Sequence, residues 1–476
     1  MRYNNIKCLY LRKISEIMLK HIRLHRGLDI PLKGMAELNV EKSIIPDVVA
    51  VKPTDFKGVT PKLMVREGDA VKAGRVLFID KYHPEVCFTS PCSGTVKEVV
   101  RGEKRKLLQI LVQADKDTDY LQFNKTDVSK ASKEEITKLL LESGLWASVK
   151  QRPYGIIANP VNEPKAIFIS AFDSAPLAPD YDFVLKDELS FMQVAVDALS
   201  KLTKGKVHVG LKAKGYESSP LYKLKNVEFA TFDGPHPAGN VGVQIHHIDP
   251  VSKGDVVWTV DAIALAAIGK LFSKGVYDVS RLVAVTGNRA SKNAYVKAVP
   301  GMAIKEIDFM AGPAKEELYG QPCDIRYISG NVLSGENVGH DGYLGFYDSQ
   351  ITLISEGDYY ECLGWAKIFR PKKFSFSHSY FSWLTPGKKY NADSNLNGGH
   401  RAFVVTGLYE KVLPMDIYPV YLLKAILAED IDKMEQLGIY EVVPEDLALC
   451  EYVCPSKIDV QQIVTKGIDI MIKEMA

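Results

Sequence analysis

The stretches VREGDAVKAG (Val65–Gly74) and TSPCSGTV (Thr89–Val96) decide the fold of the first part of this chain. Each consists of a glycine turn between short runs of β-branched and apolar residues, which is the pattern of a β-hairpin. A single hairpin of this length cannot bury a core alone. We therefore predict two small hairpins packed face to face, within a β domain over residues 18–115.

The dipeptide Gly68-Asp69 is a tight-turn signal, and it predicts the strand pairing of the first half. Leu63 and Val65 should face Val71 and residues 76–78 across a hairpin. The two halves resemble the barrel-sandwich hybrid of biotinyl and lipoyl carrier domains. Carriers present a modified lysine in a Glu-Ala-Met-Lys-Met-like tip, whereas Lys81 lies in DKYHPEVC. We therefore interpret the domain as a scaffold with a solvated Lys81.

The composition is that of an ordinary multidomain protein. The chain has 476 residues, of which 46% are hydrophobic and 25% charged, so we expect three or four domains. The formal net charge is only +2, which gives no overall field for nucleic acid. We expect no nucleic-acid partner.

Nothing in the sequence has the length and apolarity of a membrane span. The nearest stretch, Val256–Phe272, is interrupted by Asp261 and Lys270. Residues 1–17 lack a continuous apolar core, so they do not form a secretory signal, and we expect a disordered or non-native extension there. The chain is expected to be soluble or peripheral, not membrane-spanning.

The regions after residue 115 alternate between helix and strand signals. Residues 116–159 form a helical linker, in which Ser132 and Glu135 make a capping box and Gly144 a left-handed C-cap. Residues 160–275 alternate apolar strands and amphipathic helices, which predicts a Rossmann-like parallel sheet. Residues 276–340 indicate a β-grasp (SLBB-like) module. Residues 341–476 form a C-terminal domain that is helical from about 416. The expected class is therefore α/β multidomain.

Two loops of the Rossmann-like region are candidate ligand loops. They carry Asp173 and Pro176, and His236, Gly239 and Gly242. Such loops lie at the carboxyl ends of the strands, where open α/β sheets bind ligands. Neither the dinucleotide fingerprint nor a phosphate-binding loop occurs, so a structural role is favoured over a nucleotide site. We assign no catalytic residue.

Two metal-like patterns fail on geometry. His246 and His247 are adjacent, and in a strand their side chains would point to opposite faces. Asp393, Asn395 and Asn397 fit the start of an EF-hand loop, but the twelfth position is Val404 instead of Glu. We therefore expect no metal ligands from either pattern.

The seven cysteines are scattered, which is typical of reduced thiols. Cys450 and Cys454 form the end of the ferredoxin run Cys-x-x-Cys-x-x-Cys-x-x-x-Cys-Pro. The positions of the two preceding cysteines of that run hold Leu447 and Pro444. Two thiolates cannot complete a four-thiolate site, so we interpret the pair as a remnant of a cluster motif.

The segment Val412–Ala428 is apolar around most of a helix circumference. Two interpretations remain open. The helix is either wholly internal, or Tyr418 and Tyr421 help to seat the chain on a membrane-bound neighbour.

From residue 18 onward the chain resembles the A subunits of the sodium-translocating NADH:quinone oxidoreductases. The resemblance rests on motifs spread over the sequence, which are RGLDIP (Arg26–Pro31), FTSPCSG (Phe88–Gly94), ESGLW (Glu142–Trp146), GPHPAGNVG (Gly234–Gly242) and LALCEYVCP (Leu447–Pro455). The family is related to the peripheral subunit of Rnf complexes.

The resemblance implies a peripheral subunit on the cytoplasmic face of the bacterial inner membrane. Its partners would be the other subunits, the membrane-embedded quinone-reducing one most directly. Flavins and iron–sulfur clusters would lie on partner subunits, with no cofactor on this chain and ubiquinone as the substrate of the complex. NADH oxidation there reduces ubiquinone and exports sodium. Two alternatives remain, a structural adaptor that binds no quinone, and an Rnf-type NADH-oxidising subunit with FMN and iron–sulfur clusters.

Overall fold

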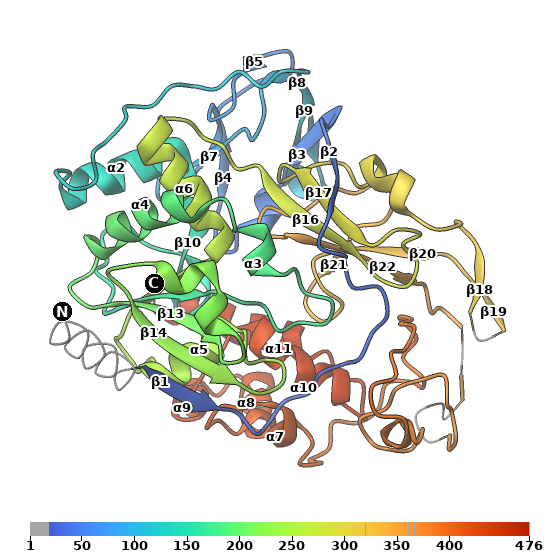
Figure 1. Ribbon diagram of the computed structural model, residues 1–476. Helices are drawn as coiled ribbons and strands as arrows, with labels where there is room; N and C mark the ends of the chain where they lie inside the picture. Colours follow the sequence, from blue (N-terminus) through green and yellow to red (C-terminus); the bar gives the residue numbers. More distant parts are fainter. Residues whose placement is uncertain (1–18, 319, 360, 363, 365–366, 476) are drawn as a thin grey trace, which may run out of the picture.

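The computed structural model describes residues 19–475 apart from 319, 360, 363, 365 and 366. Three small β-sheets, two larger mixed sheets and a helical C-terminal region make up the described part of the chain (Figure 1). The α/β class is therefore confirmed. The extension expected at residues 1–17 lies outside the described residues.

The first part forms two small sheets from interlocked halves. The Gly68 N–H donates to the Val96 carbonyl at 2.8 Å, and the Val96 N–H donates to the Asp69 carbonyl at 2.9 Å. The two halves are therefore hydrogen-bonded to each other at the first glycine turn. The sheets have the orders β3 (Val48–Val51), β9 (Leu107–Ala114), β8 (Gly94–Arg101), β5 (Ala70–Val71), and β4 (Pro61–Leu63), β6 (Val76–Asp80), β7 (Cys87–Thr89).

The strand pairing within these halves differs in part from the prediction. Leu63 pairs with Phe78, as expected. Val71 pairs instead with Gly94 of the other half, so its expected partner was wrong. Gly94 has a φ of 155°, and a Cβ there would lie 2.0 Å from the Gln113 carbonyl oxygen. Its lack of a side chain lets β8 and β9 approach closely, and this exchange of strands between halves makes the hybrid barrel.

The helix α2 (Lys133–Ser143) of the linker confirms the local signals. The Glu135 N–H donates to the Ser132 hydroxyl, and the Ser132 N–H donates to the Glu135 carboxylate. Gly144 is left-handed, with a φ of 83°. The 3-10 turn η3 (Leu145–Ser148) then places the buried Trp146 against Trp258 of the next sheet.

The seven-stranded sheet is parallel except at one side. Strands β10 and β11 are paired antiparallel, whereas the other five strands are parallel to one another. Its order is β1 (Lys20–Arg23), β14 (Glu228–Asp233), β13 (Val207–Lys212), β12 (Ile167–Ser170), β15 (Val257–Val260), β10 (Val149–Arg152), β11 (Ile156–Ile157).

Four of these strands were not expected in this sheet. β1 lies within the stretch 18–115, β10 and β11 lie within 116–159, and β14 was not predicted as a strand. The helices are α3 (Tyr181–Val184), α4 (Leu189–Ser200), α5 (Val241–Ile248) and α6 (Ala262–Lys274). Helices α4 and α6 touch so closely that a Cβ at Gly269 would lie 1.8 Å from the Phe191 carbonyl oxygen.

The six-stranded sheet contains the expected β-grasp arrangement. A hairpin of β16 and β17 is followed by the 3-10 helix η6 (Ile304–Met310) and by β20 and β22, with β16 and β22 parallel at the centre. Strand β22 lies beyond residue 340, so the module extends further than its expected limit. The strand order of this sheet is β2 (Val40–Ser43), β17 (Ala294–Ala298), β16 (Arg281–Thr286), β22 (Gln350–Ser355), β20 (Ile325–Ser329), β21 (Glu336–Asn337). Strands β18 (Glu316–Leu318) and β19 (Gln321–Cys323) form a separate hairpin.

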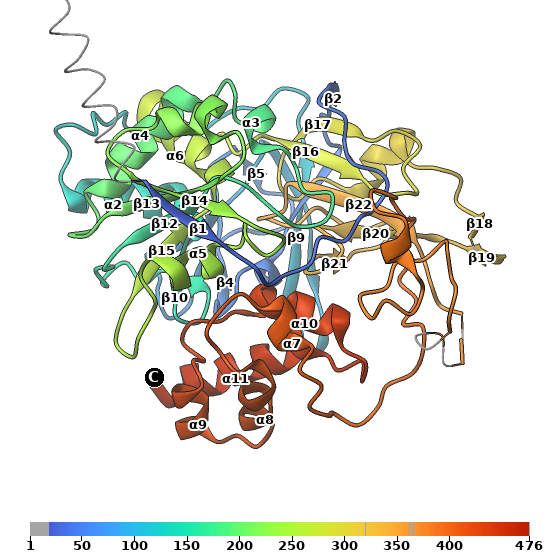
Figure 2. The ribbon, with the colours of Figure 1, turned by 60° about the horizontal axis from the view of Figure 1, so that its bottom comes forward.

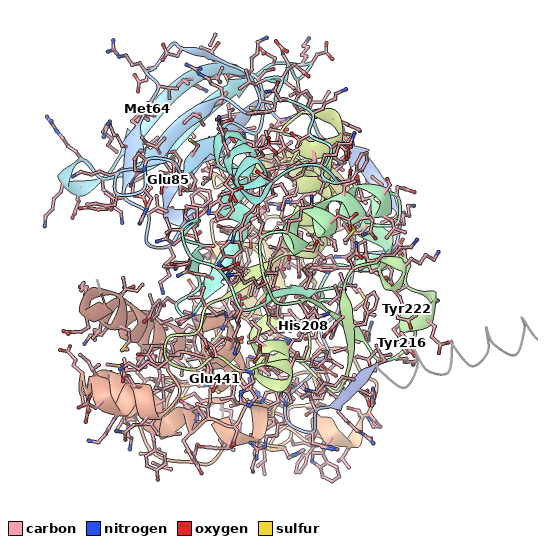
Figure 3. The ribbon with its side chains drawn as sticks, turned by 90° about the vertical axis from the view of Figure 1, so that its left-hand side faces the viewer. Met64, Glu85, His208, Tyr216, Tyr222 and Glu441 are labelled. Carbon is pink, nitrogen blue, oxygen red and sulfur yellow. The ribbon has the colours of Figure 1, made fainter. Side chains whose placement is uncertain are left out.

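The C-terminal region packs its helices around one apolar core. Pro419 begins α8, as the sequence predicted. Figures 2 and 3 show these helices below the sheets, with Glu441 beside α5. No helix in the described part of the chain is long and apolar enough to span a membrane. The helices are α7 (Tyr409–Val412), α8 (Pro419–Leu427), α9 (Ile431–Gln436), α10 (Ala448–Val453) and α11 (Val460–Met475).

Candidate functional site

The two candidate ligand loops meet at the carboxyl edge of the seven-stranded sheet. Asp173 and Pro176 follow β12, and His236 and Gly239 follow β14. Ser174 joins the loops, because its hydroxyl contacts His236 Nδ1 at 3.0 Å and accepts the Gly239 N–H at 2.8 Å. The structure therefore brings these loops together, as expected for loops that follow parallel strands of one sheet.

Burial changes the protonation of both titratable groups in these loops. It lowers the pKa of His236 to about 4, so the imidazole is neutral at pH 7. It raises the pKa of Asp173 to about 6, although the Ala175 N–H donates to the Asp173 carboxylate at 2.8 Å and opposes the shift. Of the two groups, Asp173 therefore titrates closer to neutral pH.

Residues of the C-terminal region fill the crevice beside these loops. Asp446 lies in the 3-10 turn η9 (Pro444–Leu447), and a Cβ at Gly242 would lie 2.5 Å from Asp446 Oδ1. The Asn240 side-chain amide also donates to the Glu445 carbonyl at 3.3 Å. An internal carboxylate thus occupies the start of α5, where an anionic ligand could otherwise bind. The loops form part of a domain interface, and the ligand role of Asp173, Pro176, His236, Gly239 and Gly242 stays a prediction.

The histidine pair lies in a helix, so the strand assumed from the sequence was wrong. His246 and His247 are in α5, with ring centroids 5.1 Å apart. His246 Nδ1 contacts Glu441 at 2.7 Å and its Nε2 accepts the Asp416 N–H at 3.0 Å, whereas His247 contacts the Val243 carbonyl. Across the residues described, no three His, Cys, Asp or Glu side chains converge as a metal site. His246 therefore joins α5 to the C-terminal region.

The cysteine pair contacts a tyrosine in the C-terminal core. Cys450 lies within α10 and Cys454 is the residue that caps its C-terminus, and both side chains are buried. The Tyr409 hydroxyl donates to Cys454 Sγ at 2.9 Å, and Cys450 Sγ lies 3.9 Å from the Tyr409 carbonyl oxygen. Burial raises the pKa of Cys450 above its usual range. Burial therefore favours the protonated thiol of Cys450, and the interpretation of the pair as a remnant of a cluster motif stays a prediction.

A groove of about 830 Å³ opens between the β-grasp sheet and the C-terminal region, and we call it the C-terminal groove. Its volume falls within the roughly 300–1,000 Å³ that small-molecule sites occupy. Aliphatic and aromatic side chains form much of its walls. They include Ile30, Leu32, Ile328, Val332, Leu333, Phe374, Phe376, Tyr390, Tyr452, Val453 and Ile458.

One end of the C-terminal groove carries a buried ammonium group. Lys373 Nζ pairs with Asp393 at 3.0 Å and donates to the Tyr359 hydroxyl and the Asn397 amide oxygen, both at 2.9 Å. Burial lowers the pKa of Lys373, and Asp393 opposes the shift. Asp393 and Asn397 of the EF-hand-like run therefore bind the ammonium group of an internal lysine.

A second ammonium lines the same groove without such partners. Lys457 lies in the loop after α10, and burial lowers its pKa. Its side chain makes no hydrogen bond or ion pair within the part of the chain that the structure describes. Lys457 also has a φ of 57°, so the left-handed backbone at this position determines the direction in which its side chain leaves the chain. Lys457 is therefore a hydrogen-bond donor that is available to a ligand in the groove.

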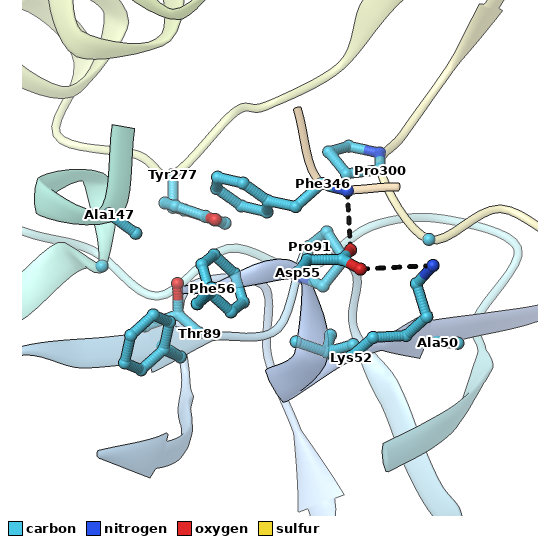
Figure 4. A pocket seen from close by; sticks show the side chains of 14 residues that line it. Ala50, Lys52, Asp55, Phe56, Thr89, Pro91, Ala147, Tyr277, Pro300 and Phe346 are labelled. Atoms are coloured by element: carbon cyan, nitrogen blue, oxygen red, sulfur yellow. Dashed lines mark hydrogen bonds and ion pairs between the residues drawn. The ribbon is translucent and has the colours of Figure 1, made fainter. Parts of the chain in front are cut away.

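A narrower cavity, the aromatic slot, lies where the hybrid barrel, η3 and the β-grasp loops meet (Figure 4). Phe56 is its central ring, with centroid distances of 4.4 Å to Phe88 and 4.9 Å to Phe346. At one end Lys52 pairs with Asp55 at 3.2 Å, and the Phe346 N–H donates to that carboxylate at 2.9 Å. Burial disfavours the Lys52 ammonium, but Asp55 and Glu336 raise its pKa overall.

The free space of the aromatic slot is about 10 Å³, which is room for one water molecule. A larger ring could enter only if the walls moved apart. These walls come from three different regions of the chain, which are the hybrid barrel, η3 and the β-grasp loops.

Sequence reasoning missed both cavities. The residues of the groove come from positions 30 to 459, so no local pattern marks it. A signal for the aromatic slot was present in Lys52 and Asp55, a charge pair that directly follows the wholly apolar strand β3. The failed EF-hand match at Asp393 did mark a polar cluster, whose partner is a lysine and not a metal.

Comparisons with known proteins agree over most of the chain. Residues 22–115 match the family model described as NqrA N-terminal barrel-sandwich hybrid domain, and residues 131–277 match the NqrA second alpha/beta domain. Three relatives are named as the A subunit of a Na(+)-translocating NADH-quinone reductase. The proteins of Neisseria meningitidis, Rhodopirellula baltica and Vibrio anguillarum are 37%, 36% and 36% identical to this chain over 95% of its length, covering 100%, 98% and 100% of their own.

Proposed function

This chain belongs to the family of the A subunits of Na(+)-translocating NADH-quinone reductases, and on that basis we propose that it is a peripheral subunit that binds the quinone head group. The other subunits would be its partners. They would carry the flavins and iron–sulfur clusters, pass electrons from NADH to ubiquinone and export sodium. This chain would contribute no cofactor of its own and would lie on the cytoplasmic face of the membrane.

The observation that carries the quinone proposal is the C-terminal groove. A quinone needs apolar walls for its ring and one or two donors for its carbonyl oxygens. The groove offers about 830 Å³ between aliphatic and aromatic side chains. Lys457 would donate to one quinone carbonyl, because its ammonium has no other partner in the described part of the chain. Tyr452 and Phe374 line the same groove and would contact the ring.

The aromatic slot is a second candidate for the head group. It is favoured by one observation, the buried Lys52 ammonium beside the rings of Phe56 and Phe346. Its free volume of about 10 Å³ argues against it, since a substituted benzoquinone ring cannot enter without movement of the walls. We therefore rank the groove above the slot.

The proposal is tested by titrating the full chain with a short-chain ubiquinone and measuring the Kd by calorimetry. Lys457→Met should raise the Kd roughly ten- to hundredfold, because a hydrogen bond from a charged donor contributes about 1.5–3 kcal/mol. Lys52→Met should leave the Kd unchanged, as should the control Lys62→Met, which changes an exposed side chain on strand β4.

Each contrary result would indicate a different site or function. A loss of binding with Lys52→Met alone would move the site to the aromatic slot. No binding by a folded chain would favour the structural adaptor. Bound FMN and iron in the purified chain would favour the Rnf-type subunit instead.

A further inference from the structure

The loops between the C-terminal helices and the β-grasp sheet expose an unusual number of large apolar side chains. Ile368 is 75% exposed, Phe369 69%, Trp383 54% and Leu384 59%. Scattered single exposures are normal on a protein surface, but a group of them marks an interaction site. Figures 1 and 2 show these loops, in orange, at the outside of the molecule beside the C-terminal helices.

The two loop segments that carry these side chains contact each other. The rings of Phe369 and Phe381 lie 6.1 Å apart, and the Leu384 N–H donates to the Phe381 carbonyl at 3.1 Å. Lys388 Nζ donates to the Pro371 carbonyl at 2.5 Å, which joins the loop of Trp383 to the loop of Phe369. We call the six residues Ile368, Phe369, Trp383, Leu384, Lys388 and Lys389 the loop patch.

The surroundings of the loop patch are strongly basic. Residues 367–409 contain seven lysines and arginines but only one acidic residue, Asp393. Asp393 is paired with Lys373, and the preceding Glu361 is paired with Lys367 and Arg370. Lys388 and Lys389 form no ion pair with any carboxylate in the described ranges. The patch therefore presents uncompensated positive charge beside exposed aromatic and aliphatic groups.

This combination fits a lipid surface better than a protein surface. Cores of protein interfaces are depleted in lysine. Aromatic and aliphatic side chains flanked by lysines instead match the boundary of an anionic bilayer, where the rings enter the headgroup region and the ammonium groups meet the phosphates. Lysine stems can also reach outward from an apolar base.

We propose that the loop patch binds the surface of an anionic lipid bilayer directly. This inference goes beyond quinone binding, because it requires neither the groove nor the aromatic slot. The two sites are nevertheless neighbours, since residues 373–377 and 390–397, which adjoin the patch positions in the sequence, also line the C-terminal groove. A groove beside the bilayer would receive a lipid-soluble ligand without its passage through water.

Vesicle flotation of the full chain tests the proposal. Vesicles of phosphatidylcholine with phosphatidylglycerol should carry the protein, and vesicles of phosphatidylcholine alone should carry much less. The variant Lys388→Gln with Lys389→Gln should weaken binding about 25-fold, since each lysine near an anionic surface contributes about a fivefold factor. Binding should also fall with added salt.

Matched variants distinguish vesicle binding through the loop patch from unspecific electrostatic attraction. Lys81→Gln with Tyr82→Ser removes an exposed lysine and an exposed ring from the hybrid barrel, and it should bind vesicles as the wild type does. Trp383→Ser with Leu384→Ser should bind more weakly while its melting temperature stays unchanged. Brominated lipids should quench the fluorescence of the wild type more than that of Trp383→Phe.

The proposal would be overturned by equal binding to neutral and anionic vesicles, by no vesicle binding at all, or by unchanged binding of both patch variants. Retention only on vesicles that contain membrane subunits would assign the patch to a protein partner and would overturn it as well. These results do not depend on quinone, so the failure of one proposal leaves the other standing.

Discussion

Arg152 of β10 and Asp446 of η9 form an ion pair of 2.7 Å, with side chains that are 4% and 0% exposed. The Arg152 guanidinium also donates to the Glu441 carbonyl at 3.1 Å, and the Val443 N–H donates to Asp446 at 3.0 Å. The pair therefore links the C-terminal region to the seven-stranded sheet, through the residue of β10 that pairs with Val257 at the start of β15.

Loss of one partner of this pair should destabilise the chain strongly. Arg152→Met leaves a buried carboxylate without its counter-ion, so we expect the free energy of unfolding to fall by about 3–5 kcal/mol in urea denaturation. Lys138→Met removes an exposed pair with Glu142 on α2 and should cost below about 0.5 kcal/mol. Equal effects of the two variants would contradict a structural role for the buried pair.

A side chain at Gly242 should separate the same two regions. In Gly242→Ala, the new methyl group would lie 2.5 Å from the Asp446 carboxylate. We expect a loss of about 1–3 kcal/mol, measured by thermal unfolding. Gly399→Ala is the control, because a Cβ there meets nothing within 4 Å. A neutral Gly242→Ala would mean that η9 can move away without cost.

His236 should make stability depend on pH. Its pKa is about 4 in the folded chain and about 6.5 in the unfolded chain, so folding favours the neutral imidazole. This contribution is complete above pH 6.5 and is lost as the pH falls toward 4, by on the order of 3 kcal/mol. His236→Gln should flatten that part of the stability profile, whereas His25→Gln, at an exposed position, should not. Parallel profiles for His236→Gln and the wild type would refute the assignment.

The two tyrosines of the C-terminal region should act in docking and not in folding. Tyr418 and Tyr421 are 63% and 56% exposed, whereas Leu422 and Leu423 of α8 are buried. Tyr418→Ser with Tyr421→Ser should therefore keep the melting temperature of the isolated chain and weaken its co-purification with membrane subunits. Leu423→Ala should instead cost about 2–5 kcal/mol.

The same variant also distinguishes the surface of Tyr418 and Tyr421 from the loop patch. The tyrosine variant should still bind anionic vesicles, because the loop patch is intact. A melting temperature several degrees lower would show that the tyrosines belong to the core, and the docking hypothesis would then be wrong.

Short-range signals of the sequence predicted much of the local structure. Ser132, Glu135 and Gly144 bound α2 because capping needs only groups within a few residues of the helix end. Pro419 begins α8 for the same kind of reason, since its fixed φ suits a first helical turn. The glycine turns at Gly68 and Gly94 likewise specified the small β domain, although the partner of Val71 was not foreseen.

The sequence by itself therefore determined the turns, caps, apolar runs and family resemblance, all of which depend on neighbouring residues or on motifs. The tertiary structure alone decided that β1 and β14 share a sheet, that Asp446 fills the crevice at Gly242, and that Lys457 lines a groove with Ile30. These contacts join positions up to hundreds of residues apart. Their choice depends on the sum of many weak packing and pairing energies over the whole chain, and no local pattern contains that sum.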